Sequence, residues 1–80
     1  PTHKEIHLNL GNIFILQQNF LKAELYLKQA IALDPDYVLA YENLVLSAQM
    51  QNKMKDVKVY LNKILEIAPN HNARLILKNL

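Results

Sequence analysis

Only a few residues of this 80-residue chain have side chains that could carry out chemistry. His3 and His7 lie four residues apart, which places both on one side of a helix, as two ligands of a zinc ion would need. No third or fourth ligand lies near them, and Glu5 points to a different side of the same helix. We therefore predict no metal site, and we expect His7 to serve in packing.

Nucleophiles are nearly absent as well. The chain has one serine, Ser47, one threonine, Thr2, and no cysteine. Ser47 lies within an apolar helical stretch, where its hydroxyl is expected to bond to its own helix backbone. Gly11 is the only glycine, so there is no glycine-rich phosphate loop. The carboxylates are interpreted as caps and solubilising charges rather than an acid–base pair: Asp34, Asp36, Glu42, Asp56 and Glu66. The sequence predicts a non-enzymatic protein without a cofactor.

Composition and charge exclude further classes. The apolar fraction is 51%, with one Gly and three Pro, which suits one compact all-helical domain. The net charge is +2, and Lys53, Lys55 and Lys58 are the nearest approach to a basic stripe, so no nucleic acid is expected as a partner. No apolar run could span a bilayer and no signal peptide is visible, so no membrane is expected either. The compartment stays open, with the cytoplasm favoured. Because the chain starts at Pro1, we expect it to be part of a longer protein.

Helix signals divide the chain into five segments. Thr2 and Glu5 form a capping box that opens a helix to about Gln17. Asn19 is expected to cap a helix from Phe20 to about Leu33, which Pro35 ends. The remaining expectations are a cap at Asp36 with a helix from Tyr37 to about Gln51, a helix over 54–67 that Pro69 ends, and a short helix to Leu80 capped by Asn70 or Asn72. The connections are short, so each helix must run antiparallel to the one before it.

The first helix has more apolar residues than one buried face can use. A single buried stripe is predicted from the spacing of Ile6, Leu10, Ile13, Phe14 and Gln17. Leu8, Ile15 and Leu16 lie off that stripe. We therefore expect this helix to be covered on a second side, by another helix or by a ligand.

A repeat with a period of 34 residues organises the chain. Pro35 and Pro69 are separated by this interval, and the repeats are placed at 4–37 and 38–71, with 72–80 starting a third. Other matched pairs occupy packing positions: Asn9 with Asn43, Leu10 with Leu44, Gln17 with Gln51, Tyr26 with Tyr60, and Leu27 with Leu61. A single closed helical bundle is the alternative, and the repeat makes it less favoured.

At these positions the chain resembles the tetratricopeptide repeat family. The family pattern is met in the first repeat by Leu10, Gly11, Phe14, Ala23, Ala30 and Pro35, with His7 at the tryptophan position and Leu27 at the second aromatic position. The resemblance implies an all-α, right-handed α-solenoid of antiparallel helical hairpins: two units plus a fifth, partial or capping helix. Gly11 and Ala23 are expected to be small because the two helices cross closely there.

The second repeat departs from the pattern. Val45 replaces the glycine, Val57 and Ile64 replace alanines, and Ala48 replaces the aromatic residue. Bulk has moved from one site to others facing it, which can conserve the volume of the core. We expect this hairpin to survive.

The resemblance also implies a concave groove, lined by the first helix of each repeat, that binds a protein or peptide of unknown identity. Carried over to this sequence, its residues are Leu8, Asn9, Asn12, Ile15, Leu16, Leu39, Glu42, Asn43, Leu46, Gln49 and Met50. Glu5 belongs to the same set, and Ala73, Ile76, Leu77 and Leu80 would extend it. The amides of Asn9, Asn12 and Asn43 can bond a peptide backbone, with apolar pockets between them.

The sequence also bears on other partners and other roles. Repeats that clamp the C-terminal carboxylate of chaperone tails use cations where this chain has Leu8, Ala73 and Leu77, so such tails are not expected as ligands. A second role is structural self-association, through Leu75, Ile76, Leu77 and Leu80. A third is that of an accessory segment in a larger enzyme such as a glycosyltransferase, which the resemblance allows.

Overall fold

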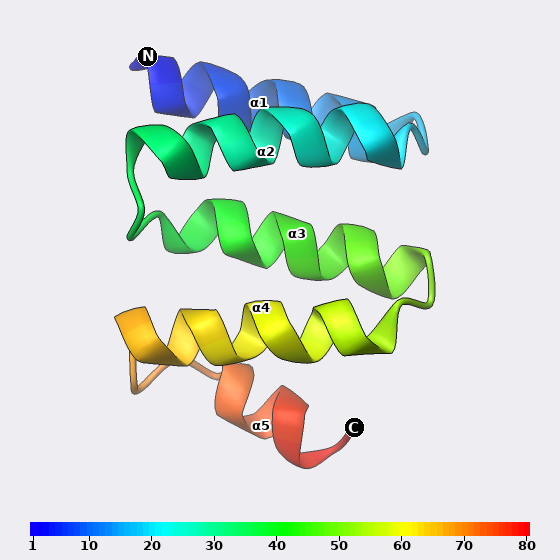
Figure 1. Cartoon of the computed structure of the whole chain (residues 1–80), viewed down its shortest axis with the longest axis vertical. Helices are drawn as coiled ribbons and strands as arrows, with labels where there is room; N and C mark the ends of the chain where they lie inside the picture. The colour runs from blue at the N-terminus through cyan, green and yellow to red at the C-terminus, as the bar shows by residue number, and fades with distance from the viewer.

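The computed structural model describes all 80 residues and contains five helices and no strand (Figure 1). The helices are α1 (His3–Leu16), α2 (Phe20–Leu33), α3 (Val38–Met50), α4 (Met54–Ile67) and α5 (Ala73–Lys78). α1 and α2 form one antiparallel hairpin and α3 and α4 a second, while α5 packs on α4. α3 contacts both α2 and α1. The predicted all-α stack of helical hairpins is confirmed.

The backbone repeats itself at the tight turns. Gln18 and Asn52 both have a φ of 58°. The amide of the next residue bonds across each turn: Asn19 N–H donates to Phe14 O at 2.8 Å, and Lys53 N–H donates to Ala48 O at 2.9 Å. The two turns are therefore equivalent at the spacing of the prolines.

The same holds at the links between successive units, which we call the first junction (residues 34–37) and the second junction (residues 68–71). Tyr37 N–H donates to Asp34 O at 3.1 Å, and His71 N–H donates to Ala68 O at 3.0 Å. Pro35 and Pro69 occupy the same place in the two junctions. At the level of the backbone, the chain therefore repeats its junction as well as its turn.

Two predicted caps are confirmed. Thr2 Oγ1 accepts from Glu5 N–H at 3.4 Å, and the Glu5 carboxylate accepts from Thr2 N–H at 3.4 Å, completing the capping box. Bonds from the Thr2 hydroxyl, and then from its backbone, hold the pKa of Glu5 below its usual value. Asn19 Oδ1 accepts from Lys22 N–H at 3.3 Å at the start of α2.

One predicted cap is wrong. α3 begins at Val38 with Tyr37 at its N-cap, and Asp36 caps nothing: its N–H donates to Asp34 Oδ1 at 3.1 Å, so Asp34 shapes the junction. At α5, Asn72 occupies the N-cap position as predicted, but its side chain makes no cap bond; His71 Nδ1 accepts from Ala73 N–H at 2.8 Å instead. This helix also ends at Lys78, before the predicted Leu80.

The buried face of α1 differs from the predicted stripe. Leu8, Gly11 and Ile15 are buried, whereas Ile6 and Ile13 are 42% and 47% exposed. Gln17 is exposed as well, and Leu10 and Phe14 are half-buried. The reason is that α1 packs against α3 as well as α2, so its buried face turns toward the space between them.

Gly11 marks the closest approach of the first hairpin. A Cβ placed on Gly11 would lie 2.6 Å from Leu27 Cδ2 and 2.7 Å from Leu27 Cγ, a separation too short for non-bonded carbons. The close crossing predicted from the glycine is therefore confirmed. Phe14 lies beside it in sequence and stacks on Tyr26, with ring centroids 5.5 Å apart and planes 9° from parallel.

The core consists of two clusters, one between α1, α2 and α3 and one between α3, α4 and α5. Cluster one contains Leu8, Ile15, Ala23, Leu27, Ala30, Ala40 and Leu44. Cluster two contains Val45, Ala48, Val57, Leu61, Ile64 and Ala73. All four residues at which the second repeat departs from the pattern lie in cluster two, so the redistributed bulk is accommodated and the second hairpin forms as expected.

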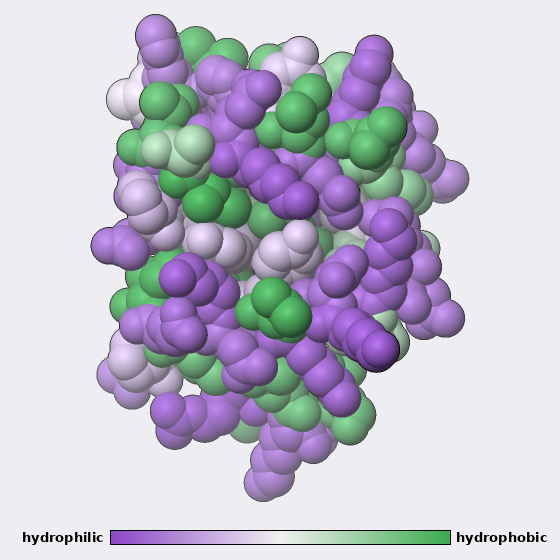
Figure 2. All heavy atoms as spheres, in the orientation of Figure 1, coloured by the Kyte–Doolittle hydropathy of each residue, from purple (hydrophilic) through white to green (hydrophobic).

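The face seen in Figure 2 is mostly hydrophilic, and its hydrophobic residues form separate islands. No helix combines the length and the apolar character that crossing a bilayer requires.

Candidate functional site

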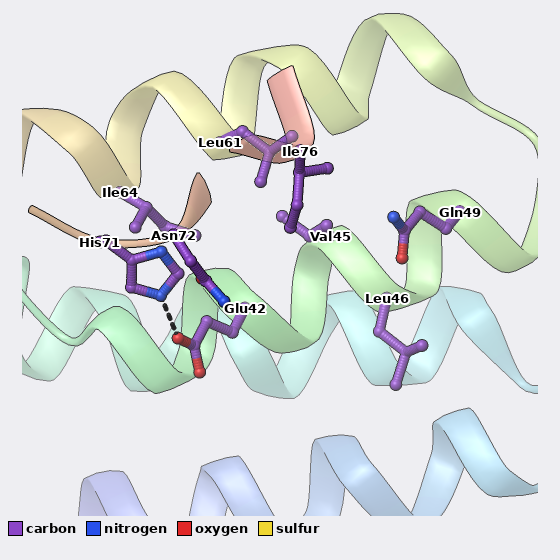
Figure 3. Close-up of a pocket in the computed structure, with 9 residues that line it drawn as sticks. All are labelled: Glu42, Val45, Leu46, Gln49, Leu61, Ile64, His71, Asn72 and Ile76. Atoms are coloured by element: carbon purple, nitrogen blue, oxygen red, sulfur yellow. Dashed lines mark hydrogen bonds and ion pairs between the residues drawn. The ribbon is translucent and has the colours of Figure 1, made fainter. Parts of the chain in front are cut away.

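A hollow of about 300 Å³ lies between α3, α4 and α5 (Figure 3). Its floor is apolar, because Val45, Leu61 and Ile64 are each at most 6% exposed, while Leu46 at the rim is 44% exposed. In Figure 3 the Leu46 side chain points away from α4 toward the neighbouring first hairpin. The complete lining is Glu42, Val45, Leu46, Gln49, Leu61, Ile64, His71, Asn72 and Ile76.

His71 and Glu42 form a polar pair at one end of this hollow. His71 Nε2 lies 2.5 Å from Glu42 Oε2, and the side chains are 18% and 39% exposed. Because His71 Nδ1 accepts the Ala73 N–H, the ring proton belongs on Nε2, which then donates to the carboxylate. The imidazole thus joins the start of α5 to α3.

Three predicted groove residues meet in the hollow: Glu42, Leu46 and Gln49. Leu16, Leu39 and Met50 lie outside it and are strongly exposed, at 84%, 53% and 48%.

The three asparagines of the predicted groove lie on its two helices, Asn9 and Asn12 on α1 and Asn43 on α3. Asn9 is exposed, and Asn12 and Asn43 are half-buried. None of their side chains bonds to another residue of the chain. No buried side-chain polar atom lacks a partner, so these amides are open to water or to a ligand.

Two predicted groove residues are placed wrongly. Leu8 and Ile15 are 9% and 2% exposed and belong to cluster one, so they lie in the core and do not face a ligand. Ala73, expected to extend the groove, is fully buried in cluster two. These residues point inward because α1 and α5 each turn one side toward the adjacent helices. Ile76 and Leu77 pack partly against cluster two, whereas Leu75 and Leu80 are exposed.

The sequence did not predict that His71 lines the hollow, nor that Val45, Leu61 and Ile64 form its floor. One signal was available. Glu42 and His71 occupy the repeat positions of Leu8 and Tyr37, so an apolar pair in the first repeat is replaced by a polar pair in the second.

The side chains singled out in the sequence for possible chemistry, Ser47 and His7, contact groups of their own helices. Ser47 is fully buried, and its Oγ accepts from Gln51 Nε2 at 3.1 Å, a side-chain partner rather than the predicted backbone one. His7 Nδ1 lies 2.7 Å from the carbonyl oxygen of His3. No three His, Cys, Asp or Glu side chains gather closely enough to hold a metal ion.

Comparison with known proteins identifies the first hairpin. The sequence signature of the tetratricopeptide repeat matches residues 5–37, which cover α1, α2 and the first junction. Residues 5–37 are a tetratricopeptide repeat. Repeats of this kind are protein-interaction modules and are not themselves catalytic.

Two relatives carry segments similar to this chain. It is 31% identical over 75 residues to protein O-mannosyl-transferase Tmtc3 of Drosophila melanogaster, which covers 94% of the chain and 8% of that protein. It is 28% identical over 67 residues to protein O-mannosyl-transferase F38B6.6 of Caenorhabditis elegans, covering 84% of the chain and 10% of that protein. The chain thus spans a tenth or less of the length of these relatives. No solved structure matches it significantly.

Proposed function

We propose that the chain binds a peptide segment of a partner protein along the face formed by α1, α3 and α5. The hollow between α3, α4 and α5 is the observation that carries this proposal, because it combines an apolar floor with polar groups at its edge. Pockets that bind ligands are commonly of this kind, mainly apolar with a few polar groups that fix orientation.

The peptide is held by two kinds of contact. Asn9, Asn12 and Asn43 offer free amides that can donate to and accept from a peptide backbone without reading its sequence. Leu46 and Met50 offer exposed apolar surface for its side chains, and the flexible Met50 adapts to different ones. An extended or a helical segment can use both kinds of contact.

A pair of matched double variants tests this function. Asn43→Ala with Leu46→Glu alters the groove, whereas Asn62→Ala with Val59→Glu makes the same two changes on exposed positions of α4. For a partner protein recovered with the native chain, we expect the groove variant to weaken binding at least about tenfold and the α4 variant to leave it unchanged. Normal binding by the groove variant would show that the groove is assigned wrongly.

A second candidate function is that of an accessory segment in a larger mannosyl-transferring enzyme, where the groove would hold the protein to be modified. The names of the two relatives favour it. In the full-length protein, the groove variant should then lower transfer to a protein acceptor without changing transfer to a minimal peptide acceptor. Equal effects on both acceptors would count against this role.

Self-association is a third candidate, supported by Leu75 and Leu80, which are 63% and 46% exposed at the end of the stack. Light scattering over a range of concentrations tests it. A dimer that Leu75→Glu dissociates would support this role, and a monomer at high concentration would contradict it.

A further inference from the structure

We propose that the hollow between α3, α4 and α5 binds a cationic side chain, a lysine or arginine of the partner peptide, with Glu42 as its counter-charge. This inference rests on the proposed function and names the chemistry of the peptide.

One oxygen of the Glu42 carboxylate accepts a hydrogen bond that holds it in place, and the other has no hydrogen-bond partner. His71 Nε2–H donates to Oε2, and His71 is itself fixed because its Nδ1 accepts the Ala73 N–H. Oε1 has no partner in the chain. A positioned acceptor with a free oxygen can accept a charge-assisted bond from an incoming cation without first being reoriented.

No cation of the chain compensates this charge. Glu42 is the only charged residue of α3. On α5, the Arg74 guanidinium donates to the Pro69 carbonyl at 2.9 Å, and on α4, Lys63 pairs with Glu66 at 3.3 Å. None of these basic residues lines the hollow, so its one charged side chain is negative. Charge complementarity therefore selects a cationic ligand and disfavours an acidic one.

The floor suits the rest of such a side chain. Lysine and arginine carry apolar methylene stems, and Val45, Leu61 and Ile64 offer a buried apolar surface next to the carboxylate. Ile76 of α5 covers the other side (Figure 3). A hollow of about 300 Å³ lies at the lower limit for small-molecule sites, which favours a side chain over a cofactor.

The test uses three acetylated and amidated peptides, each with leucines on both sides of a central arginine, glutamine or glutamate. The ¹⁵N-labelled chain is titrated with each peptide by NMR. We expect the arginine peptide to shift the amide signals of Glu42, Leu46 and Gln49 and to bind at least about tenfold more tightly than the glutamate peptide. The preference should weaken as salt is added.

The variant Glu42→Gln isolates the charge, because its amide oxygen can still accept from His71 and the fold is kept. It should bring the three peptides to within about twofold of one another. Glu66→Gln removes the same charge from an exposed α4 position away from the hollow and should leave the preference intact.

The possible outcomes separate this inference from the proposed function. If all three peptides shift the groove signals equally, the cation site is refuted and the peptide groove stands. If the signals that shift lie on α2 and the exposed side of α4, or if none shifts, both are refuted. If Glu42→Gln keeps the preference for arginine, Glu42 is not the counter-charge.

Discussion

The two junctions share a backbone but are fastened by different chemistry. At the first junction, Lys4 Nζ lies 2.7 Å from Asp34 Oδ2 and 4.7 Å from the centre of the Tyr37 ring, and Tyr37 packs against cluster one, which contains Leu8. At the second junction, the positions of Leu8 and Tyr37 hold Glu42 and His71, which bond to each other. The first junction is thus held by the Lys4–Asp34 ion pair, and the second by the Glu42–His71 pair at positions that hold Leu8 and Tyr37 in the first unit.

A repeat protein can therefore vary the side chains of its junctions without losing its fold. The backbone bonds of the junction are kept, so the second hairpin and α5 still stack. The side chains that close the junction are free to change, and changing them leaves a hollow with a single carboxylate.

Ile64 lies beneath the second junction at the repeat position of Ala30, and it is fully buried. Ile64→Ala should lower the free energy of unfolding by about 3 kcal/mol, because it removes buried methyl groups from cluster two and leaves a cavity. Urea denaturation measures this. A loss below about 1 kcal/mol would mean that the floor of the hollow is loosely packed. Lys63→Ala at the neighbouring exposed position is the control, with little change expected.

Gly11→Val places in the first hairpin the residue that the second hairpin has at Val45. It should lower the free energy of unfolding by about 2 kcal/mol, because its Cβ would overlap the Leu27 side chain. Asn9→Val adds the same side chain at an exposed position of α1 and should cost only about 0.5 kcal/mol. Equal losses in the two variants would show that α1 and α2 do not cross closely at Gly11.

The polar pair can be converted to its apolar equivalent by Glu42→Leu with His71→Tyr. Each single change leaves one polar group without its partner and should cost about 1 to 2 kcal/mol, whereas the double variant should recover much of that loss. Thermal denaturation of the four proteins gives the coupling energy. If the single losses simply add, the two side chains do not interact, and the second junction is held by its backbone alone.

The first junction should respond to acid. The Lys4 hydrogen bond, aided by the Asp36 N–H, holds the pKa of Asp34 below its ordinary value of 3.8. A lowered pKa contributes stability that is present above pH 3.8 and is lost as the pH falls through the folded-state pKa. Asp34→Asn should therefore be slightly less stable than the native chain at pH 7. In denaturation curves, that difference should close below pH 3.8; a constant difference would contradict the account.

Local signals predicted the helices well. The Asn19 cap and Pro35 delimit α2, and Pro69 ends α4, because caps and prolines act on the nearest turns of the chain. The buried face of α1 could not be predicted in the same way. Apolar residues lie all around that helix, so only its packing against both α2 and α3 decides which of them are buried.

The candidate site was predicted in part for a related reason. The repeat register brought Glu42, Leu46 and Gln49 to one wall, since equivalent positions recur along α1 and α3. The hollow itself depends on His71, which lies far from Glu42 in sequence and meets it only because α5 folds back onto α4. Such a contact belongs to the tertiary structure, and helix periodicity does not contain it.

The most direct test compares the native chain with the double variant Glu42→Leu with His71→Tyr, titrated with the arginine and glutamate peptides. In the native chain the arginine peptide should bind at least about tenfold more tightly. In the converted chain, which carries the residues of the first unit at these two positions, the two affinities should be about equal. A converted chain that keeps its preference for arginine would contradict the claim that this polar pair makes the hollow a binding site for cationic peptides.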